Sequence, residues 1–485
     1  MKKSGFYLRY RFVETTAFML PIVLALFITA SCDNTSGPET WAKSYSTENR
    51  YMPESIIQAK DGGFIFHDFT AGGFTTNDNL IKINEKGSIE WQKQIDPGEV
   101  GSFVEMAQGD IIAASRENES HVGSYLTKLS AQGDLIWNKY YNGAMFRDIA
   151  PDKSGQFIFA VDGTPSVQYV SKISADGTVI WSKSVNAEVS LSRFVAADSD
   201  GGCFIALDNR NSGTKLLRFG PDGDLVWSKS YLNDVDESGF ASPELTSLGQ
   251  TTDGGCVLTL EFCYENIILA LRVDANGNRV WARELTNIVR PVEDSRYLVE
   301  GFAGPFIQRS SIVQATDGGF AVAAEGSRYA RYSYIPGYYE QYTTISGNII
   351  KLDADGAVLW SREYRNSVTT IPTYFPEVDS EIPAGVGTLN ASVLLAYSFA
   401  ATADGGYILL GQLDKADPEC VVMKTDEEGG ISGTNLKIKK GTSVVVNDFD
   451  ITIQELQIIA DDVPAVSAVD AALTVIDAAY SVSSL

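Results

Sequence analysis

Three features of this 485-residue sequence predict an all-β fold in which seven four-stranded sheets form a closed ring, a seven-bladed β-propeller. A unit with four short apolar runs recurs seven times, its runs are joined by turns rich in glycine and aspartate, and all seven tryptophans belong to one place in the unit. A lone four-stranded sheet cannot bury both of its faces, so each unit must stack on its neighbours. We expect the ring to span residues 41–430.

The first 31 residues precede the repeat and look like an export signal. Four basic residues open the segment, the apolar run TTAFMLPIVLALFITA follows, and small residues precede Cys32. The apolar run is too short and too one-sided for a comfortable permanent membrane span. We therefore expect 1–31 to be a signal peptide and 32–40 to be a linker.

The residues around Cys32 resemble the lipobox of bacterial lipoproteins, in which the signal is cut before a cysteine that then carries the lipids. Ala30 and Ser31 fit this pattern, whereas Thr29 stands where the family prefers leucine. The resemblance implies a lipidated Cys32 and an extracytoplasmic protein at the outer membrane or cell surface of a Gram-negative bacterium. A plain secretory signal with an incidental cysteine is the alternative.

The exported chain is strongly acidic. Cleavage before Cys32 leaves 34 basic against 61 acidic residues, a net charge of −27. Such a surface repels nucleic-acid phosphates and anionic lipid head groups. We therefore expect no nucleic-acid partner, and attachment to a membrane through the lipid anchor alone.

Each unit begins with a hairpin whose turn is Asp-Gly-Gly or a variant of it. Glycine accepts the positive φ that such a turn requires. The copies are clearest at 55–69, 246–262, 310–326 and 397–412, and weaker around Gly109, Gly155 and Gly201.

A second hairpin completes each unit and carries a tryptophan four residues after its turn glycine, as in KLDADGAVLWSREY at 351–364. Repeat positions of this kind serve stacking, so we expect the tryptophans to dock between neighbouring sheets. They are Trp41, Trp91, Trp137, Trp181, Trp227, Trp281 and Trp360.

One tryptophan is displaced from its unit, which indicates how the ring closes. Trp41 lies in WAKSY before the first complete unit, and the last unit, which ends in GGISG, has no tryptophan. We expect residues 41–45 to supply the outer strand of the seventh sheet, whose other strands come from 394–425. Such closure removes two exposed sheet edges.

The pattern of Asp353, Gly356 and Trp360 resembles the tryptophan-docking repeat of quinoprotein-like (PQQ-type) propellers, over roughly residues 41–430. The resemblance implies the architecture, because one fold hosts many functions. Enzymes of that family also have a vicinal cysteine pair and calcium ligands, and this sequence has no Cys-Cys pair. We therefore expect no cofactor.

Three insertions enlarge the sixth and seventh units, and they fall on one face in one sector of the ring. They are residues 286–309, 327–346 and 365–390. Long loops in a compact repeat are usually functional. The middle insertion supplies aromatic and basic candidates for ligand contact, with mutual packing of the loops as the alternative. These candidates are Arg328, Tyr329, Arg331, Tyr332, Tyr334, Tyr338, Tyr339 and Tyr342.

Little in the sequence supports catalysis or metal binding. It has two histidines, and the turns DADG at 353–356 and DANGN at 274–278 lack the glutamate that completes an EF-hand, so we expect ordinary hairpins there and no metal. Pairings among Cys203, Cys256, Cys263 and Cys420 are left open. We name no catalytic residue.

These features favour a non-catalytic, monomeric lipoprotein whose propeller binds a protein or a carbohydrate through the three insertions. Lipoprotein-anchored assembly scaffolds of Gram-negative outer membranes resemble it in anchor and repeat. The alternative is a polysaccharide lyase or glycoside hydrolase with its site on the same face. Residues 431–485 form a β-rich C-terminal extension that either packs on the ring or pairs with a partner.

Overall fold

The computed structural model forms β-strands and turns throughout its described part. It describes residues 39–46, 51–70, 78–96, 99–116, 123–144, 146–163, 167–186, 193–209, 213–232, 244–262, 267–286, 288, 304–335, 338–365, 373–376, 394–413, 419–432, 437–440, 445–448, 452–455, 460–462, 468–470, 474–477 and 481–484. Contacts within the chain make residues 40–485 one compact unit. No helix among these residues is long and apolar enough to cross a membrane.

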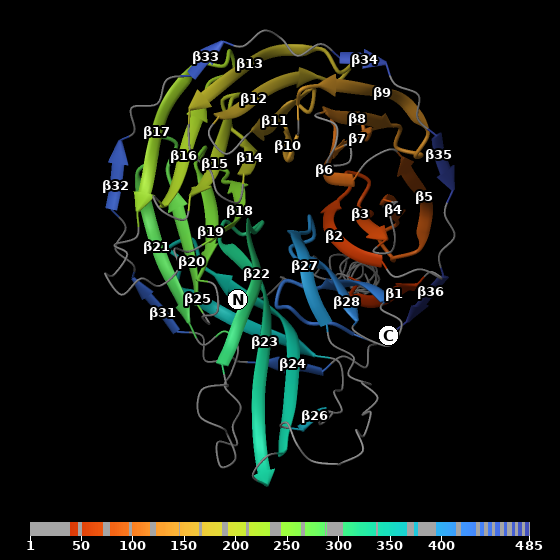
Figure 1. Cartoon of the computed structure of the whole chain (residues 1–485), viewed down its shortest axis with the longest axis vertical. Helices are drawn as coiled ribbons and strands as arrows, with labels where there is room; N and C mark the ends of the chain where they lie inside the picture. The colour runs from red at the N-terminus through yellow and green to blue at the C-terminus, as the bar shows by residue number, and fades with distance from the viewer. Residues whose placement is uncertain are drawn as a thin grey trace, which may run out of the picture. The chain divides into compact units, whose positions relative to one another are not determined.

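Seven antiparallel sheets are arranged in a ring, and each begins with its inner strand (Figure 1). The first three blades are β2 (Tyr51–Gln58), β3 (Phe64–Thr70), β4 (Asp78–Ile83) and β5 (Ile89–Asp96); β6 (Glu99–Glu105), β7 (Ile111–Arg116), β8 (Gly123–Leu129) and β9 (Leu135–Asn142); and β10 (Asp148–Pro151), β11 (Phe157–Gly163), β12 (Val167–Ser174) and β13 (Val179–Asn186).

The next three blades repeat this order. They are β14 (Arg193–Ala197), β15 (Cys203–Asn209), β16 (Gly213–Phe219) and β17 (Leu225–Leu232); β18 (Glu244–Gln250), β19 (Cys256–Glu261), β20 (Ile267–Val273) and β21 (Arg279–Thr286); and β22 (Gly304–Gln314), β23 (Phe320–Ile335), β24 (Tyr338–Leu352) and β25 (Val358–Arg365). A short strand, β26 (Thr373–Pro376), pairs with β24.

The seventh blade joins the two ends of the ring, as the sequence predicts. Its inner strands are β27 (Leu394–Ala401), β28 (Tyr407–Leu413) and β29 (Glu419–Thr425), and its fourth is β1 (Trp41–Ser46). The register runs from Trp41 opposite Lys424 to Tyr45 opposite Cys420. The prediction of a seven-bladed propeller closed by an N-terminal strand is thus confirmed.

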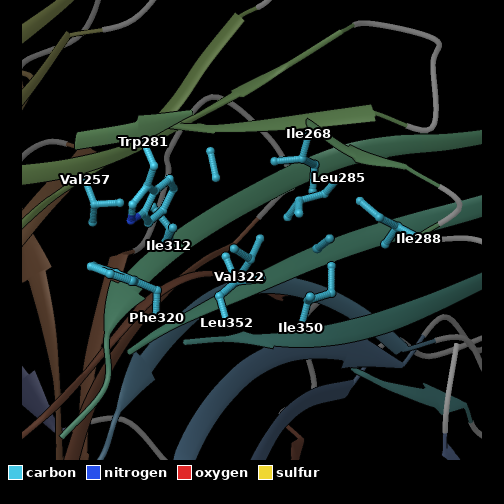
Figure 2. Close-up of a cluster of buried hydrophobic side chains, with 12 residues drawn as sticks. Val257, Ile268, Trp281, Leu285, Ile288, Ile312, Phe320, Val322, Ile350 and Leu352 are labelled. Carbon is cyan, nitrogen blue, oxygen red and sulfur yellow. The ribbon is translucent and has the colours of Figure 1, made fainter. Parts of the chain in front are cut away.

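The apolar cores lie between the blades. Among the described residues seven buried clusters occur, each drawn from two neighbouring sheets. Figure 2 shows the cluster between the fifth and sixth blades, where Trp281 and Val257 of one blade meet Phe320 and Val322 of the next. Trp281 and Phe320 pack edge to face with ring centroids 5.3 Å apart. Stacking therefore buries the faces that a single sheet would expose.

The C-terminal extension adds a fifth strand to every blade, which the sequence did not predict. Its seven strands visit the blades in reverse order, from the sixth back to the first and then to the seventh (Figure 1). We call these strands the C-terminal belt. They are β30 (Lys437–Lys440), β31 (Val445–Asp448), β32 (Thr452–Glu455), β33 (Ala460–Asp462), β34 (Ala468–Asp470), β35 (Thr474–Asp477) and β36 (Ser481–Ser484).

Each belt strand pairs antiparallel with the C-terminal half of a fourth strand. Lys183, for example, lies opposite Asp462, and Lys43 lies opposite Ser484. Strand β1 is therefore held between β29 and β36, so both ends of the chain secure the seventh blade.

Candidate functional site

The turns of the second hairpins hold neighbouring blades together through the tryptophans. The indole Nε1 of six tryptophans donates to a carbonyl oxygen of the next blade, at 2.9 to 3.3 Å. The pairs are Trp41 with Glu85, Trp91 with Ala131, Trp137 with Ala175, Trp181 with Pro221, Trp227 with Ala275, and Trp281 with Ala354. These tryptophans are therefore engaged in contacts between blades.

The turns of the second hairpins require glycine for two reasons. Their φ is positive, and a Cβ would be too close to side chains of the preceding blade. Gly87 has a φ of +73°, and a Cβ there would lie 2.9 Å from the Trp41 ring. Four residues after the tryptophan, the buried hydroxyl of Tyr45 donates to the Gly87 carbonyl at 2.8 Å. Tyr141, Tyr231 and Tyr364 make the same bond in other blades. In these four blades the tyrosine hydroxyl and the turn glycine thus serve contacts between blades.

A cation on the third strand of each blade forms another contact that the sequence analysis missed. In six blades it pairs with an aspartate of the first hairpin. The pairs are Lys82 with Asp61, Lys128 with Asp110, Arg218 with Asp198, Arg272 with Asp253, Lys351 with Asp317, and Lys424 with Asp404. The recurring Lys or Arg near the end of each third apolar run was the available signal.

In four blades these pairs lower the pKa of the aspartate, namely Asp61, Asp253, Asp317 and Asp404. Partial burial alone would raise the pKa of Asp61, but the hydrogen bond and positive charge of Lys82 outweigh it and lower the pKa below its ordinary value. In the third blade Lys172 instead donates to the carbonyl oxygens of Gly201 and Pro221, at 3.4 and 3.2 Å. The third blade therefore lacks this ion pair.

Around the axis, polar side chains of the inner strands link one blade to the next. Ser102 accepts from the Ile149 amide at 3.4 Å, and Ser398 accepts from the Ile56 amide at 3.1 Å. In the third blade the equivalent position is Asp148 instead of serine, and its carboxylate accepts from the Val195 amide at 3.0 Å. Desolvation of the partly buried carboxyl raises the pKa of Asp148 to about 6.

A buried histidine lies toward the opposite end of the first blade. Its ring nitrogens are 3.4 Å from Asp78 and 3.6 Å from Glu54. Burial would lower the pKa of His67, but the nearby carboxylates outweigh this effect and raise it. Because the His67 side chain is only 1% exposed, a ligand could not reach it without local opening.

The three insertions meet in one sheet. Residues 304–307 of β22 pair with β23, residues 327–335 of β23 pair with 338–346 of β24, and β26 pairs with β24. The middle insertion is thus a long hairpin, where the sequence analysis expected a loop, because the two strands of the blade continue into it. We call this assembly the insertion sheet, and Figure 1 shows it running beyond the other strands of its blade.

The candidate contact residues all occupy positions in this hairpin. Tyr332 lies opposite Glu340, Arg331 opposite Gln341, and Tyr329 opposite Thr343. Strand β26 brings the third insertion to the same place, with Tyr374 opposite Glu340 and Phe375 opposite Tyr339. Tyr374 and Phe375 were not among the predicted residues, although they lie in one of the predicted insertions.

Other predicted features have mixed outcomes. Cys203, Cys256 and Cys420 are buried free thiols, and burial raises the pKa of each. The Asp274 carboxylate accepts from the amides of Asn276 and Asn278 at 2.8 Å, so this turn is an Asx-type hairpin. No group of three potential metal ligands occurs among the described residues. Cys32 and Cys263 lie outside them.

Comparison with known proteins finds matches only among solved structures. No protein-family model and no curated protein matches the chain. A protein from Lactobacillus plantarum matches with 12% identity and a TM-score of 0.39, covering 83% of this chain and 99% of its own. Sqt1 from Chaetomium thermophilum matches with 9% identity and a TM-score of 0.43, covering 80% and 99%. The Dos1 propeller matches with 10% identity and a TM-score of 0.42, covering 79% and 95%.

Proposed function

We propose that this protein is a non-catalytic, extracytoplasmic lipoprotein whose propeller is a rigid scaffold for binding a protein or a carbohydrate. The proposed binding region comprises segments 286–309, 327–346 and 365–390, whose described strands form the insertion sheet. The observation that carries the proposal is the pairing of all three insertions into one sheet. Three unrelated surface loops would not be expected to pair with one another through backbone hydrogen bonds.

The dimensions of the hairpin support an exposed recognition element. Strands β23 and β24 have 16 and 15 residues, whereas β15 and β16, the corresponding strands of the fourth blade, have 7 each. At about 3.3 Å per residue, the additional residues extend each strand by roughly 25 to 30 Å. Much of the hairpin therefore lies beyond the stacked part of its blade.

The residue types along the insertion sheet suit recognition. Tyrosine offers a large rigid contact area with a polar tip, and arginine adds directional hydrogen bonds. Three of the strand positions nearest the tip are Tyr332, Tyr338 and Tyr339. Sugar rings and peptide side chains are both suitable ligands for such a surface.

Attachment is proposed from the N-terminal sequence alone. A lipid on Cys32 would tether the ring through residues 33–40. Strand β1, which begins at Trp41, would then be the first fixed element after the anchor. This arrangement suits a monomeric scaffold displayed at a membrane surface.

The experiment replaces the hairpin without disturbing the blade. Because Glu325 lies opposite Gly347, residues 326–346 can be exchanged for an Asn-Gly turn that joins β23 to β24. Glycan and peptide arrays would compare this variant with the intact protein and with a Tyr332→Ala, Tyr334→Ala, Tyr338→Ala variant. We expect the intact protein to bind a ligand that both variants lose, while their thermal unfolding stays cooperative.

Two outcomes would contradict the proposal. Binding retained by the hairpin-deleted protein would place recognition elsewhere. Release of unsaturated or reducing ends from pooled polysaccharides, lost with the same variants, would instead identify a lyase or hydrolase.

A further inference from the structure

The first hairpin of five blades depends on a second glycine after the turn. A Cβ at that position would lie only 1.9 to 2.4 Å from a backbone carbonyl oxygen at the end of the third strand. No side chain fits at such distances, so the turn lies directly against the strand. The five glycines are Gly63, Gly202, Gly255, Gly319 and Gly406.

The second and third blades depart from this rule. Their residues at the same position are Asp110 and Gln156, which carry side chains. Their residues in place of the turn aspartate are Gln108 and Ser154. Both blades therefore place a side chain where the other five have a glycine, although the Ala175 amide still donates to the Gln156 carbonyl at 2.9 Å.

A cleft of about 340 Å³ lies where these two blades meet, and both departures contribute to it. Asp110 and Gln108 line it from the second blade, and Gln156 lines it from the third. Its volume is at the lower end of the range for small-molecule sites, about 300 to 1,000 Å³. The cleft is at the end of the blades that carries the first-hairpin turns, so it is separate from the insertion sheet.

The apolar part of the cleft includes an indole ring. Trp137 and Met106 line it, together with Ile136, which is 48% exposed. The Trp137 Nε1 donates to the Ala175 carbonyl at 3.3 Å, and Lys139 lies over the ring at 5.8 Å from its centroid. These contacts fix the indole, which also packs against the apolar cluster between the second and third blades, so only part of its surface lines the cleft.

The polar part offers hydrogen-bonding groups at the rim. Gln108 and Gln156 are exposed carboxamides, each with donors and an acceptor. Asp110 is paired with Lys128 at 2.8 Å, and the exposed Asp176 adds a carboxylate. Lys128 and Lys139 offset the charges of Asp110 and Asp176, so the cleft suits a neutral ligand better than a strongly charged one.

We propose that this cleft binds a neutral pyranose sugar. Such a ring combines an apolar C–H face, which packs on aromatic and aliphatic side chains, with a rim of hydroxyls that match carboxamides and carboxylates. The site is independent of the proposed recognition through the insertion sheet. The two could act together on one glycan only if it reached both ends of the ring.

Saturation-transfer NMR tests the proposal with the methyl pyranosides of glucose, galactose, mannose and N-acetylglucosamine as probes. We expect at least one probe to bind the intact protein. A Gln108→Ala, Gln156→Ala variant should bind it at least tenfold more weakly. Gln156→Phe, which places a large side chain in the cleft, should also abolish binding.

The matched control is Asn276→Ala, which removes an exposed carboxamide from a turn of the fifth blade. This variant and the hairpin-deleted protein should both retain full binding, which separates the cleft from the insertion sheet. Absence of binding to every probe would overturn the proposal. So would binding that survives both cleft variants, or a preference for apolar peptides over the sugars.

Discussion

The smallest repeated contact in the ring joins a turn glycine of one blade to the tryptophan of the blade before it. Gly223 has a φ of +84°, and a Cβ there would lie 2.8 Å from Trp181. Gly318 has the same φ, but a Cβ there would meet nothing within 4 Å. Substitution of these two glycines therefore distinguishes the free-energy cost of a side chain at positive φ from the additional cost of its contact with the tryptophan.

Gly223→Ala should destabilise the protein more than Gly318→Ala does. Both substitutions place alanine at positive φ, which costs about 1 to 2 kcal/mol. Gly223→Ala also presses into the indole, which adds about 1 to 3 kcal/mol. Denaturant unfolding of the two variants measures the difference, and equal losses would show that the glycine does not serve tryptophan packing.

Asp148 offers a second test at a single position. Five other inner strands have serine there: Ser55, Ser102, Ser247, Ser311 and Ser398. The pKa of Asp148 is about 6 in the folded protein, above its ordinary value of 3.8, so this carboxyl is harder to ionise when the protein is folded. The stability that this residue contributes therefore falls as the pH rises from about 4 to about 6.

Asp148→Ser should stabilise the protein at pH 8 by on the order of 1 to 3 kcal/mol, because a serine hydroxyl can still accept from the Val195 amide without a buried charge. The advantage should shrink to a small fraction at pH 4, where the carboxyl is almost fully protonated in the folded protein and about half protonated in the unfolded chain. Urea unfolding at pH 4 and pH 8 measures both values. A variant that is less stable at pH 8 would show that the carboxylate is needed there.

At the scale of elements, strand β1 is the piece on which closure depends. The Trp41 side chain is 7% exposed, packs edge to face with Phe64, and donates to the Glu85 carbonyl. These contacts join β1 to the first blade, while the strand itself pairs with β29 of the seventh. Trp41 thus links the first and last blades of the ring.

Trp41→Ala should cost about 3 to 5 kcal/mol, as large truncations in cores do. Ile180→Ala is the control, because Ile180 also lies on a fourth strand but is 52% exposed. It should change the free energy of unfolding by less than about 1 kcal/mol. Chemical denaturation distinguishes the two, and a small effect of Trp41→Ala would mean that closure does not depend on this contact.

Elements with a strong repeated signal were predictable from the sequence, and others were not. The tryptophan spacing and Asp-Gly turns specify four strands per blade, and the displaced Trp41 specifies closure. Belt strands of three or four residues carry no turn glycine or tryptophan, so the alternation that predicts a β-rich extension neither locates each strand nor assigns it to a blade. Their pairing follows from the unpaired outer edges of the blades, a property of the assembled ring.

The candidate sites were likewise predictable from the sequence only in part. Insertion lengths identified the segments of the insertion sheet, but the register that joins 338–341 to β26 depends on contacts between distant segments. Asp110 and Gln156 were visible as departures from Gly-Gly. The sequence could not show that these departures form a cleft. That conclusion requires the structure, in which the second glycine of the other blades lies against a backbone carbonyl oxygen and the second and third blades are neighbours.

At the scale of the molecule, the belt covers the outer edge that each fourth strand would otherwise expose. Uncovered edges offer unpaired amides and carbonyls to other chains. The belt reaches all seven blades, and its last strand lies on β1. The C-terminal extension therefore protects the ring and reinforces its closure.

A chain that ends at residue 432 should still form the ring but associate through its edges. We expect a lower midpoint of thermal unfolding and concentration-dependent oligomers in light scattering, whereas the full chain stays monomeric. A chain that ends at residue 480 lacks only β36 and should show a smaller effect. A truncated ring that remains a stable monomer would show that the belt has no such protective role.

Amide hydrogen exchange along residues 41–46 and 437–484 of the full chain tests the closed and belted ring most directly. If β1 lies between β29 and β36 and every belt strand pairs with a blade, the 41–46 amides should be strongly protected. Protected amides should also recur in each of the seven belt strands. Exchange within seconds throughout 437–484, with 41–46 no better protected than an edge strand, would contradict the account.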